Sequence, residues 1–266
     1  MPKYFLLLII TLIASNVWAA DSARIAVASN MSQAISDIAQ IFQQDTNIRT
    51  QLTSGSSGNF ARQIIQGAPY SLFLSADKKY VDLLRANDIE IVKQVQYVRG
   101  RIGLFVSKTS ELSRVRDLKS VIKKLYHGNF NRLVIANPMH APYGLASEQA
   151  LQSAGLWVIE KHRFLLAENA AQATQITVSG NVDLGIISAS HAHLQKVQTR
   201  GQFFLIPEQW HQPLQQYLLV LKGANEAEMK LFKYLQSKQA QLLLKIYGYT
   251  PSLLIEEGEA YGLASP

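Results

Sequence analysis

The chain has 266 residues, of which 48% are hydrophobic and 17% charged, enough apolar material for the core of one large or two medium domains. It contains no cysteine, which excludes disulfides, thiolate metal sites, a cysteine nucleophile and a cysteine-borne lipid anchor. The net charge of +7 comes from scattered basic residues without a dense tract, so we expect a bias toward small anions and no nucleic-acid partner.

Residues 1–19 are predicted to form a cleaved secretory signal peptide. Lys3 supplies a positive charge, the run from Tyr4 to Ala14 is almost wholly apolar, and Val17 and Ala19 occupy the two cleavage positions. The run is short for a membrane span, so an uncleaved N-terminal anchor is the less favoured alternative. We expect cleavage after Ala19. The periplasm is the expected compartment, because an exported protein without a lipid anchor needs an outer membrane to keep it near the cell.

Short apolar strands alternate with amphipathic helices from Arg24 onward, which predicts an α/β architecture with mainly parallel sheets. The first predicted elements are a strand at 25–28, a helix with Ala34, Ile35, Ile38, Ile41 and Phe42 on one face, a strand at 50–53, a helix carrying 60–65, a strand at 72–74 and a helix capped by Asp77. The later ones are strands at 102–106 and 133–136, a helix at 143–154, a strand at 164–166, a helix at 170–178, strands at 184–187 and 217–221, and helices at 226–235 and 238–247.

Small polar residues, glycine or proline follow four of the predicted strands. These junctions are Ser29-Asn30, Gly55-Ser56-Ser57-Gly58, Asn137-Pro138 through Pro142-Tyr143-Gly144, and Glu168-Asn169-Ala170. In open α/β sheets, ligands bind at the carboxyl ends of strands, beside helix N-termini whose unpaired N–H groups attract anions. A helix cap or a turn explains any one junction by itself. The coincidence of four predicts a polar cleft suited to an anion.

The histidines and the familiar catalytic motifs do not indicate an enzyme. His191 and His193 are two residues apart in a predicted helix, so they do not share a face and make a poor metal pair. His140 lies beside the third junction, but loop histidines are commonly just solvated. The sequence presents no Ser/His/Asp set and no Gly-Lys-Ser nucleotide loop. We therefore expect no enzyme activity, no cofactor and no direct metal ligands.

Several longer motifs resemble the periplasmic molybdate-binding proteins of ABC transporters, which are type II periplasmic binding proteins. The matching segments are Ser54 to Ile64, Gly67-Ala68-Pro69, Phe73 to Asp77, Ala136-Asn137-Pro138, Ala141 to Gly144, Ala167 to Ala170 and Tyr247-Gly248-Tyr249. The resemblance covers essentially the whole chain after the predicted signal peptide. It implies a two-lobed α/β periplasmic-binding-protein fold with two crossover strands, near Gly100 to Val106 and Gln215 to Leu221. Residues 20–101 and 217–266 would form lobe 1, and residues 102–216 would form lobe 2.

The resemblance also implies a ligand and its contacts. Family members capture molybdate through hydroxyl, amide and backbone N–H donors from both lobes and deliver it to the membrane permease of an ABC importer. The corresponding ligand-binding residues here would be Ser29, Asn30 and Ser57, with Tyr143 and Ala170 acting through their backbone N–H groups. Many members have a tyrosine donor after the strand at 184–187, where this chain has Ser188, our sixth candidate.

The same residues would hold the molybdate oxyanion through its oxygens. Tungstate is nearly the same size, so we expect it to bind as well, and we expect a monomer. The alternative is the same fold binding another small anion such as sulfate, phosphate or an organic acid. An enzyme or a sensor domain on this fold is a more distant alternative, because the chain has no cysteine for a covalently held cofactor and no further signalling segment.

Overall fold

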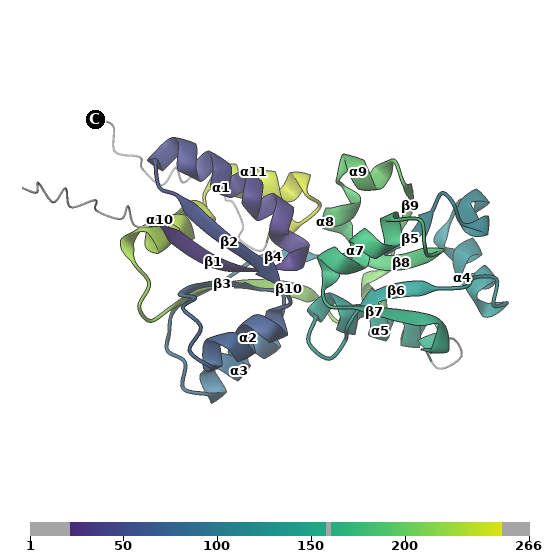
Figure 1. The fold of residues 1–266 in the computed structure, drawn as a ribbon, viewed down its shortest axis with the longest axis horizontal. Coiled ribbons are helices and arrows are strands. Elements are labelled where there is room, and N and C mark those ends of the chain that lie inside the picture. Colours follow the sequence, from purple (N-terminus) through teal and green to yellow (C-terminus); the bar gives the residue numbers. More distant parts are fainter. Residues whose placement is uncertain (1–21, 158–160, 252–266) are drawn as a thin grey trace, which may run out of the picture.

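The computed structural model describes residues 22–157 and 161–251, which form two lobes side by side, each built on one sheet (Figure 1). The first sheet has the strand order β11-β4-β10-β3-β1-β2 and the second has the order β7-β6-β8-β5-β9. The strands of the first sheet are β1 (Ala23–Ala28), β2 (Thr50–Gly55), β3 (Leu72–Ser75), β4 (Ile91–Gly100), β10 (Leu214–Leu221) and β11 (Thr250–Pro251). Those of the second are β5 (Ile102–Ser107), β6 (Leu133–Ala136), β7 (Phe164–Ala167), β8 (Leu184–Ser188) and β9 (Gly201–Leu205).

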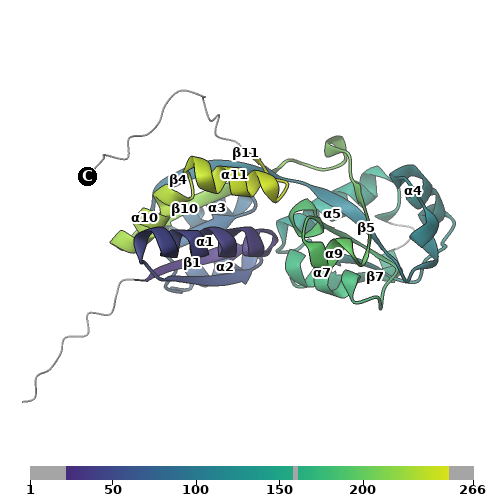
Figure 2. The same cartoon turned by 90° about the horizontal axis from the view of Figure 1, so that it is seen from above.

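Helices cover both faces of each sheet, as the view from above also shows (Figure 2). The first lobe contains the 3₁₀ turn η1 (Ser29–Met31) and the helices α1 (Ser32–Thr46), α2 (Ser57–Ile65), α3 (Lys78–Ala86), α10 (Glu226–Tyr234) and α11 (Lys238–Ile246). The second contains η2 (Glu111–Arg114), α4 (Leu118–Tyr126), α5 (Pro142–Ser153), η3 (Lys161–Arg163), α7 (Ala170–Val178), α8 (Ala189–Ala192), α9 (Gln195–Gln198) and η4 (Glu208–Trp210).

Alternating side chains of buried strands pack against helices on opposite faces, which is why these strands are continuous apolar runs. In β3, Leu72 and Leu74 join the core under α1, α10 and α11, whereas Phe73 joins the core formed with α2 and α3. In β6, Leu133 and Ile135 pack with α4 and α5, and Val134 packs with α7. Burying each such large side chain stabilises the fold by about 1.5–3 kcal/mol relative to exposing it.

The prediction of mainly parallel sheets is wrong for the strands that enter from the neighbouring lobe. The units β1-α1-β2 and β6-α5-β7 do contain parallel pairs, and β1 also pairs with β3 in parallel. However, β10 is antiparallel to β3 and β4, and β5 is antiparallel to β8 and β9. The reason is topological: the parallel strands end at the cleft between the lobes, whereas β5 and β10 begin there. Both sheets are therefore mixed.

The chain crosses between the lobes twice, which confirms the predicted two-lobed α/β architecture with two crossovers. The first crossing is at Arg101, between β4 and β5, and the second lies between the end of β9 and Leu214. Because β10 pairs with β4 from Leu214 onward, the first sheet resumes slightly before residue 217. None of the helices described is long and apolar enough to cross a membrane. The predicted signal peptide and its cleavage site lie outside the described residues.

Candidate functional site

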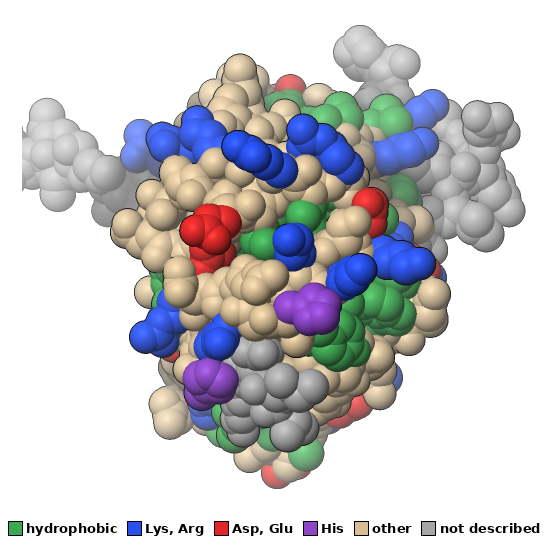
Figure 3. Space-filling model, turned by 90° about the vertical axis from the view of Figure 1, so that its right-hand side faces the viewer, with side chains coloured by type: hydrophobic (Ala, Val, Ile, Leu, Met, Phe, Trp, Pro, Cys, Tyr) green, Lys and Arg blue, Asp and Glu red, His purple; other side chains and the backbone are tan. Residues whose placement is uncertain are grey.

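One pocket between the lobes brings together all four predicted strand-to-helix junctions. Its lining residues are Ala28, Ser29, Asn30, Gly55, Ser56, Ser57 and Ala76 from the first lobe, and Ala141, Pro142, Tyr143 and Ala170 from the second. It encloses about 180 Å³, part of which is open to solvent. Drug-sized ligands need about 300–1,000 Å³, so this space suits only a small molecule or ion. No lining residue is charged, and Lys and Arg side chains are instead spread over outer surfaces such as the end of the second lobe (Figure 3).

The two serines of the Gly55-Ser56-Ser57-Gly58 turn have different hydrogen-bonding partners. Ser56 caps α2, since its side chain accepts a hydrogen bond from the backbone N–H of Asn59 at 3.4 Å. Ser57 is fully buried, and its Oγ accepts a hydrogen bond from the N–H of Ala76 at 3.0 Å. A hydroxyl has a single proton in addition to its acceptor sites. The Ser57 proton is therefore available to donate into the pocket.

The Ser29 hydroxyl, on the other side of the pocket, also accepts a hydrogen bond from a backbone N–H, but this partner belongs to the second lobe. Its Oγ accepts a hydrogen bond from the N–H of Ala171 in α7 at 3.3 Å. This contact joins the end of β1 to the first turn of α7 across the cleft. The Ser29 hydroxyl consequently also has a proton to donate, and it reaches this position only when the lobes are together.

Three helices begin at the pocket and direct backbone N–H groups toward it. Ser57, Tyr143 and Ala170 lie in the first turns of α2, α5 and α7, where a helix supplies no acceptor for its own N–H groups. Among the backbone–backbone hydrogen bonds of turns and caps in the described residues, none uses these three N–H groups. The helix dipoles place partial positive charge at the same ends. The combination favours an anion without any lysine or arginine.

The side chain of Asn30 is occupied by a buried network and does not provide a free donor. Its Nδ2, which has two protons, lies within hydrogen-bonding distance of three acceptors: Tyr143 Oη at 3.1 Å, Gln216 Oε1 at 3.2 Å and Tyr249 Oη at 2.9 Å. Burial raises the pKa of the Tyr143 and Tyr249 hydroxyls well above the ordinary value, so both stay protonated. Asn30 can therefore serve a ligand through its backbone N–H. Gln216 was not predicted to belong to this network, although a glutamine within an otherwise apolar strand indicates a buried polar contact.

Ser188, the sixth predicted site residue, is fully buried and is not among the residues that line the pocket. Its Oγ caps α8 by accepting a hydrogen bond from the N–H of His191 at 3.3 Å, and it lies 3.0 Å from Ser190 Oγ. The replacement of the family's tyrosine by Ser188 stays a prediction, and the observed role of its hydroxyl is the cap of α8.

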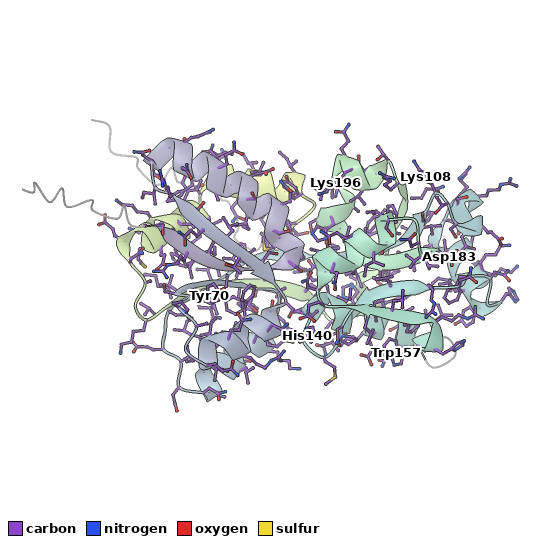
Figure 4. All side chains as sticks on the ribbon, viewed as in Figure 1. Tyr70, Lys108, His140, Trp157, Asp183 and Lys196 are labelled. Carbon is purple, nitrogen blue, oxygen red and sulfur yellow. The ribbon has the colours of Figure 1, made fainter. Side chains whose placement is uncertain are left out.

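His140 lies between the two lobes and is not simply solvated (Figure 4). Its Nδ1 is 3.1 Å from Ser56 Oγ, and its Nε2 is 3.6 Å from a carboxylate oxygen of Glu168. Its backbone carbonyl accepts a hydrogen bond from the N–H of Gly58 at 3.0 Å. A Cβ on Gly58 would lie 2.7 Å from that carbonyl oxygen, so glycine is required for this approach. His140 thus contributes to the contact between the lobes.

Within the described ranges, no group of three or more His, Cys, Asp or Glu residues is placed to hold a metal ion.

The model of the bacterial extracellular solute-binding protein family matches residues 23–250. The molybdate-binding protein ModA of Azotobacter vinelandii is 33% identical over 233 residues, covering 86% of this chain and 90% of the relative. ModA of Escherichia coli strain K12 is 30% identical over 235 residues, with coverages of 87% and 90%.

A solved structure of the periplasmic molybdate-binding protein of Azotobacter vinelandii is similar in fold. It has a TM-score of 0.78 and 27% sequence identity, and the match covers 86% of this chain and 99% of that one. The family match extends over nearly all of the described residues. The chain therefore belongs to the bacterial extracellular solute-binding proteins, and it is a binding protein rather than an enzyme.

Proposed function

We propose that this protein captures molybdate, and tungstate as well, in the periplasm and delivers it to the membrane permease of an ABC importer. The observation that carries the proposal is the donor set of the pocket, which is uncharged and comes from both lobes. The first lobe supplies the hydroxyls of Ser29 and Ser57, and the second supplies the N–H groups of Tyr143 and Ala170. The relatives named as molybdate-binding proteins support the choice of ligand.

A pocket that offers donors selects a ligand that offers only acceptors. Both serine hydroxyls already accept a backbone N–H, which commits an acceptor site on each oxygen to the protein. A fully deprotonated tetrahedral oxyanion accepts at every oxygen, whereas a protonated phosphate also presents a proton that needs an acceptor. Each charge-assisted hydrogen bond contributes about 1.5–3 kcal/mol. Pocket size then separates molybdate and tungstate from the smaller sulfate.

Lobe closure follows from the division of the donors between the lobes. A ligand shifts a conformational equilibrium only by its difference in affinity for the two states. An anion held by one lobe has half of its donors, and closure adds the other half. Closure also removes water from the anion, which strengthens each remaining electrostatic contact. The closed form is then the form that a permease recognises as loaded.

The proposed signal-peptide cleavage and the proposed lobe boundaries rest on the sequence. We propose that residues 1–19 are removed, that residues 20–101 and 217–266 form lobe 1 and residues 102–216 lobe 2, and that the protein acts as a monomer. The chain passes from the first sheet to the second at Arg101, which supports the boundary between residues 101 and 102. N-terminal sequencing of the periplasmic fraction should find Ala20 first, and a retained Met1 would contradict cleavage.

Calorimetric titration with molybdate, tungstate, sulfate and phosphate tests the ligand. Molybdate and tungstate should bind, and both should raise the melting temperature through linkage, whereas equal concentrations of sulfate or phosphate should raise it far less. Equal stabilisation by sulfate would contradict molybdate as the ligand and would favour another small anion.

A further inference from the structure

His191 lies behind the pocket and links residues of both lobes. It belongs to α8 in the second lobe and is 4% exposed. Its Nε2 is 3.2 Å from the carbonyl oxygen of Ser29 in the first lobe, and its Nδ1 is 2.9 Å from Thr174 Oγ1. Thr174 Oγ1 lies 2.9 Å from the carbonyl oxygen of Ala170. The imidazole therefore contacts the pocket residue Ser29 directly and reaches α7 through Thr174, without lining the pocket itself.

The partners of the ring determine which nitrogen carries its proton. A carbonyl oxygen only accepts, so Nε2 must be the donor toward Ser29, and Nδ1 is then the unprotonated nitrogen, 2.9 Å from Thr174 Oγ1, whose proton goes to the Ala170 carbonyl. Burial lowers the pKa of His191 to about 4, and the positive charge of Lys196 lowers it as well, while hydrogen bonds to the backbones of Ser29 and Ala170 raise it. The ring is consequently neutral near pH 7, with this single tautomer.

The carbonyl that His191 holds is one half of the peptide between Ser29 and Asn30. In a trans peptide the C=O and the N–H point in opposite directions. A carbonyl directed at α8 therefore turns the N–H of Asn30 to the opposite side, where Ser29 and Asn30 line the pocket. Ser190 repeats the arrangement, since its Oγ donates to the carbonyl oxygen of Asn30 at 2.8 Å. The two α8 side chains thus fix consecutive peptides of η1.

We infer that His191 is a positioning residue of the anion site, which orients the Asn30 N–H toward the bound oxyanion when the lobes close. The inference rests on the proposed function, and it adds a donor whose direction depends on a residue outside the pocket. Because the bond from Nε2 to the Ser29 carbonyl spans the cleft, it exists only in the closed form. Its loss should therefore speed dissociation of the anion and should reduce the preference for molybdate over sulfate.

Three substitutions separate positioning from simple packing. His191→Gln places an amide donor near the former Nε2. His191→Asn places one near the former Nδ1 and leaves the Ser29 carbonyl with only its backbone donor, the N–H of Ser32. His191→Phe removes both nitrogens while keeping a ring. We expect Phe and Asn to weaken molybdate binding about tenfold or more and to lower the molybdate-to-sulfate affinity ratio, and Gln to stay within about threefold of the wild type. His127→Phe, at the exposed end of α4, is the matched control and should leave both quantities unchanged.

Titration calorimetry and stopped-flow dissociation measure these effects, and the melting temperature of the free protein is recorded for each variant. Wild-type affinity for both Phe and Asn would overturn the inference, and so would equal losses in Gln and Asn. If Phe does not fold, the Gln and Asn pair decides. A wild type that prefers sulfate contradicts the proposed ligand alone, and the variants are then compared with sulfate. A wild type that binds none of the oxyanions overturns both.

Discussion

Replacing Ser57 by alanine removes one hydroxyl that accepts a hydrogen bond within the protein and that we propose as a donor to the bound anion. The side chain is fully buried at the start of α2, and its oxygen accepts the N–H of Ala76 at 3.0 Å. Its proton is the group assigned to the anion. The substitution leaves the backbone N–H of residue 57 and the Ser56 cap in place. The helix therefore still begins at the pocket, with one donor fewer.

The two functions of the hydroxyl predict two separate losses. A hydrogen bond to a charged oxygen contributes about 1.5–3 kcal/mol, so Kd should rise roughly tenfold to a hundredfold. The Ala76 N–H also loses its acceptor, at a cost of about 1–3 kcal/mol for a buried donor. That second cost is present with and without the anion, so it lowers the melting temperature of the free protein and leaves Kd unchanged.

Ser110→Ala is the matched control, because Ser110 is also buried and its Oγ accepts the N–H of Leu112 at 3.1 Å, but it does not line the pocket. Both variants should melt at lower temperature than the wild type. Only Ser57→Ala should weaken molybdate binding in a calorimetric titration. An unchanged Kd for Ser57→Ala would refute the reasoning, since it would mean that the hydroxyl serves Ala76 alone.

Three further outcomes follow from the cleft. Ser188→Ala should change the molybdate Kd less than about fivefold, because its oxygen caps α8 outside the pocket, and a larger loss in the same titration would restore it as a donor. Gly58→Ala should weaken binding and keep the lobes apart in small-angle scattering with molybdate, because its Cβ would lie 2.7 Å from the His140 carbonyl oxygen. Since burial holds the pKa of His191 at about 4 against 6.5 when unfolded, the unfolded chain binds the extra proton between these values. Stability should therefore fall by up to about 3 kcal/mol as the pH drops from about 6.5 to about 4, and urea unfolding should show a smaller fall for His191→Gln.

Elements with a local signature were predicted well. The bounds of β6 and α7 agree with the prediction, since β6 is a short run of buried apolar residues and Asn169 caps α7. By contrast, β4 was missed because Lys93, Gln94 and Gln96 interrupt its apolar pattern, and it is a strand through its pairing with β10 and β11. In α1 the predicted apolar face is buried except for Ile41, which is half-buried.

The pocket could be predicted because each of its four junctions follows a local rule, namely that the end of a parallel strand precedes a helix N-terminus. The network around Asn30 could not be predicted, because Tyr143, Gln216 and Tyr249 are far away in the sequence and meet it only in the folded chain. The same holds for the contact of His191 with Ser29. The correspondence between sequences supplied Ser188 as a position, whereas its cap on α8 is visible only in the folded chain.

Some groups around the pocket stabilise the closed form, whereas others destabilise it when no anion is bound. The Gly58–His140, His191–Ser29 and Ser190–Asn30 hydrogen bonds join the lobes through groups that need no anion. However, closing the cleft without an anion would also bury the N–H groups of the three helix starts without acceptors, at a cost of about 1–3 kcal/mol each. In the proposed function, an oxyanion removes that cost by accepting from all of them. Residues that join the lobes should therefore govern how long the closed form lasts, whereas the donors should govern which anion closes it.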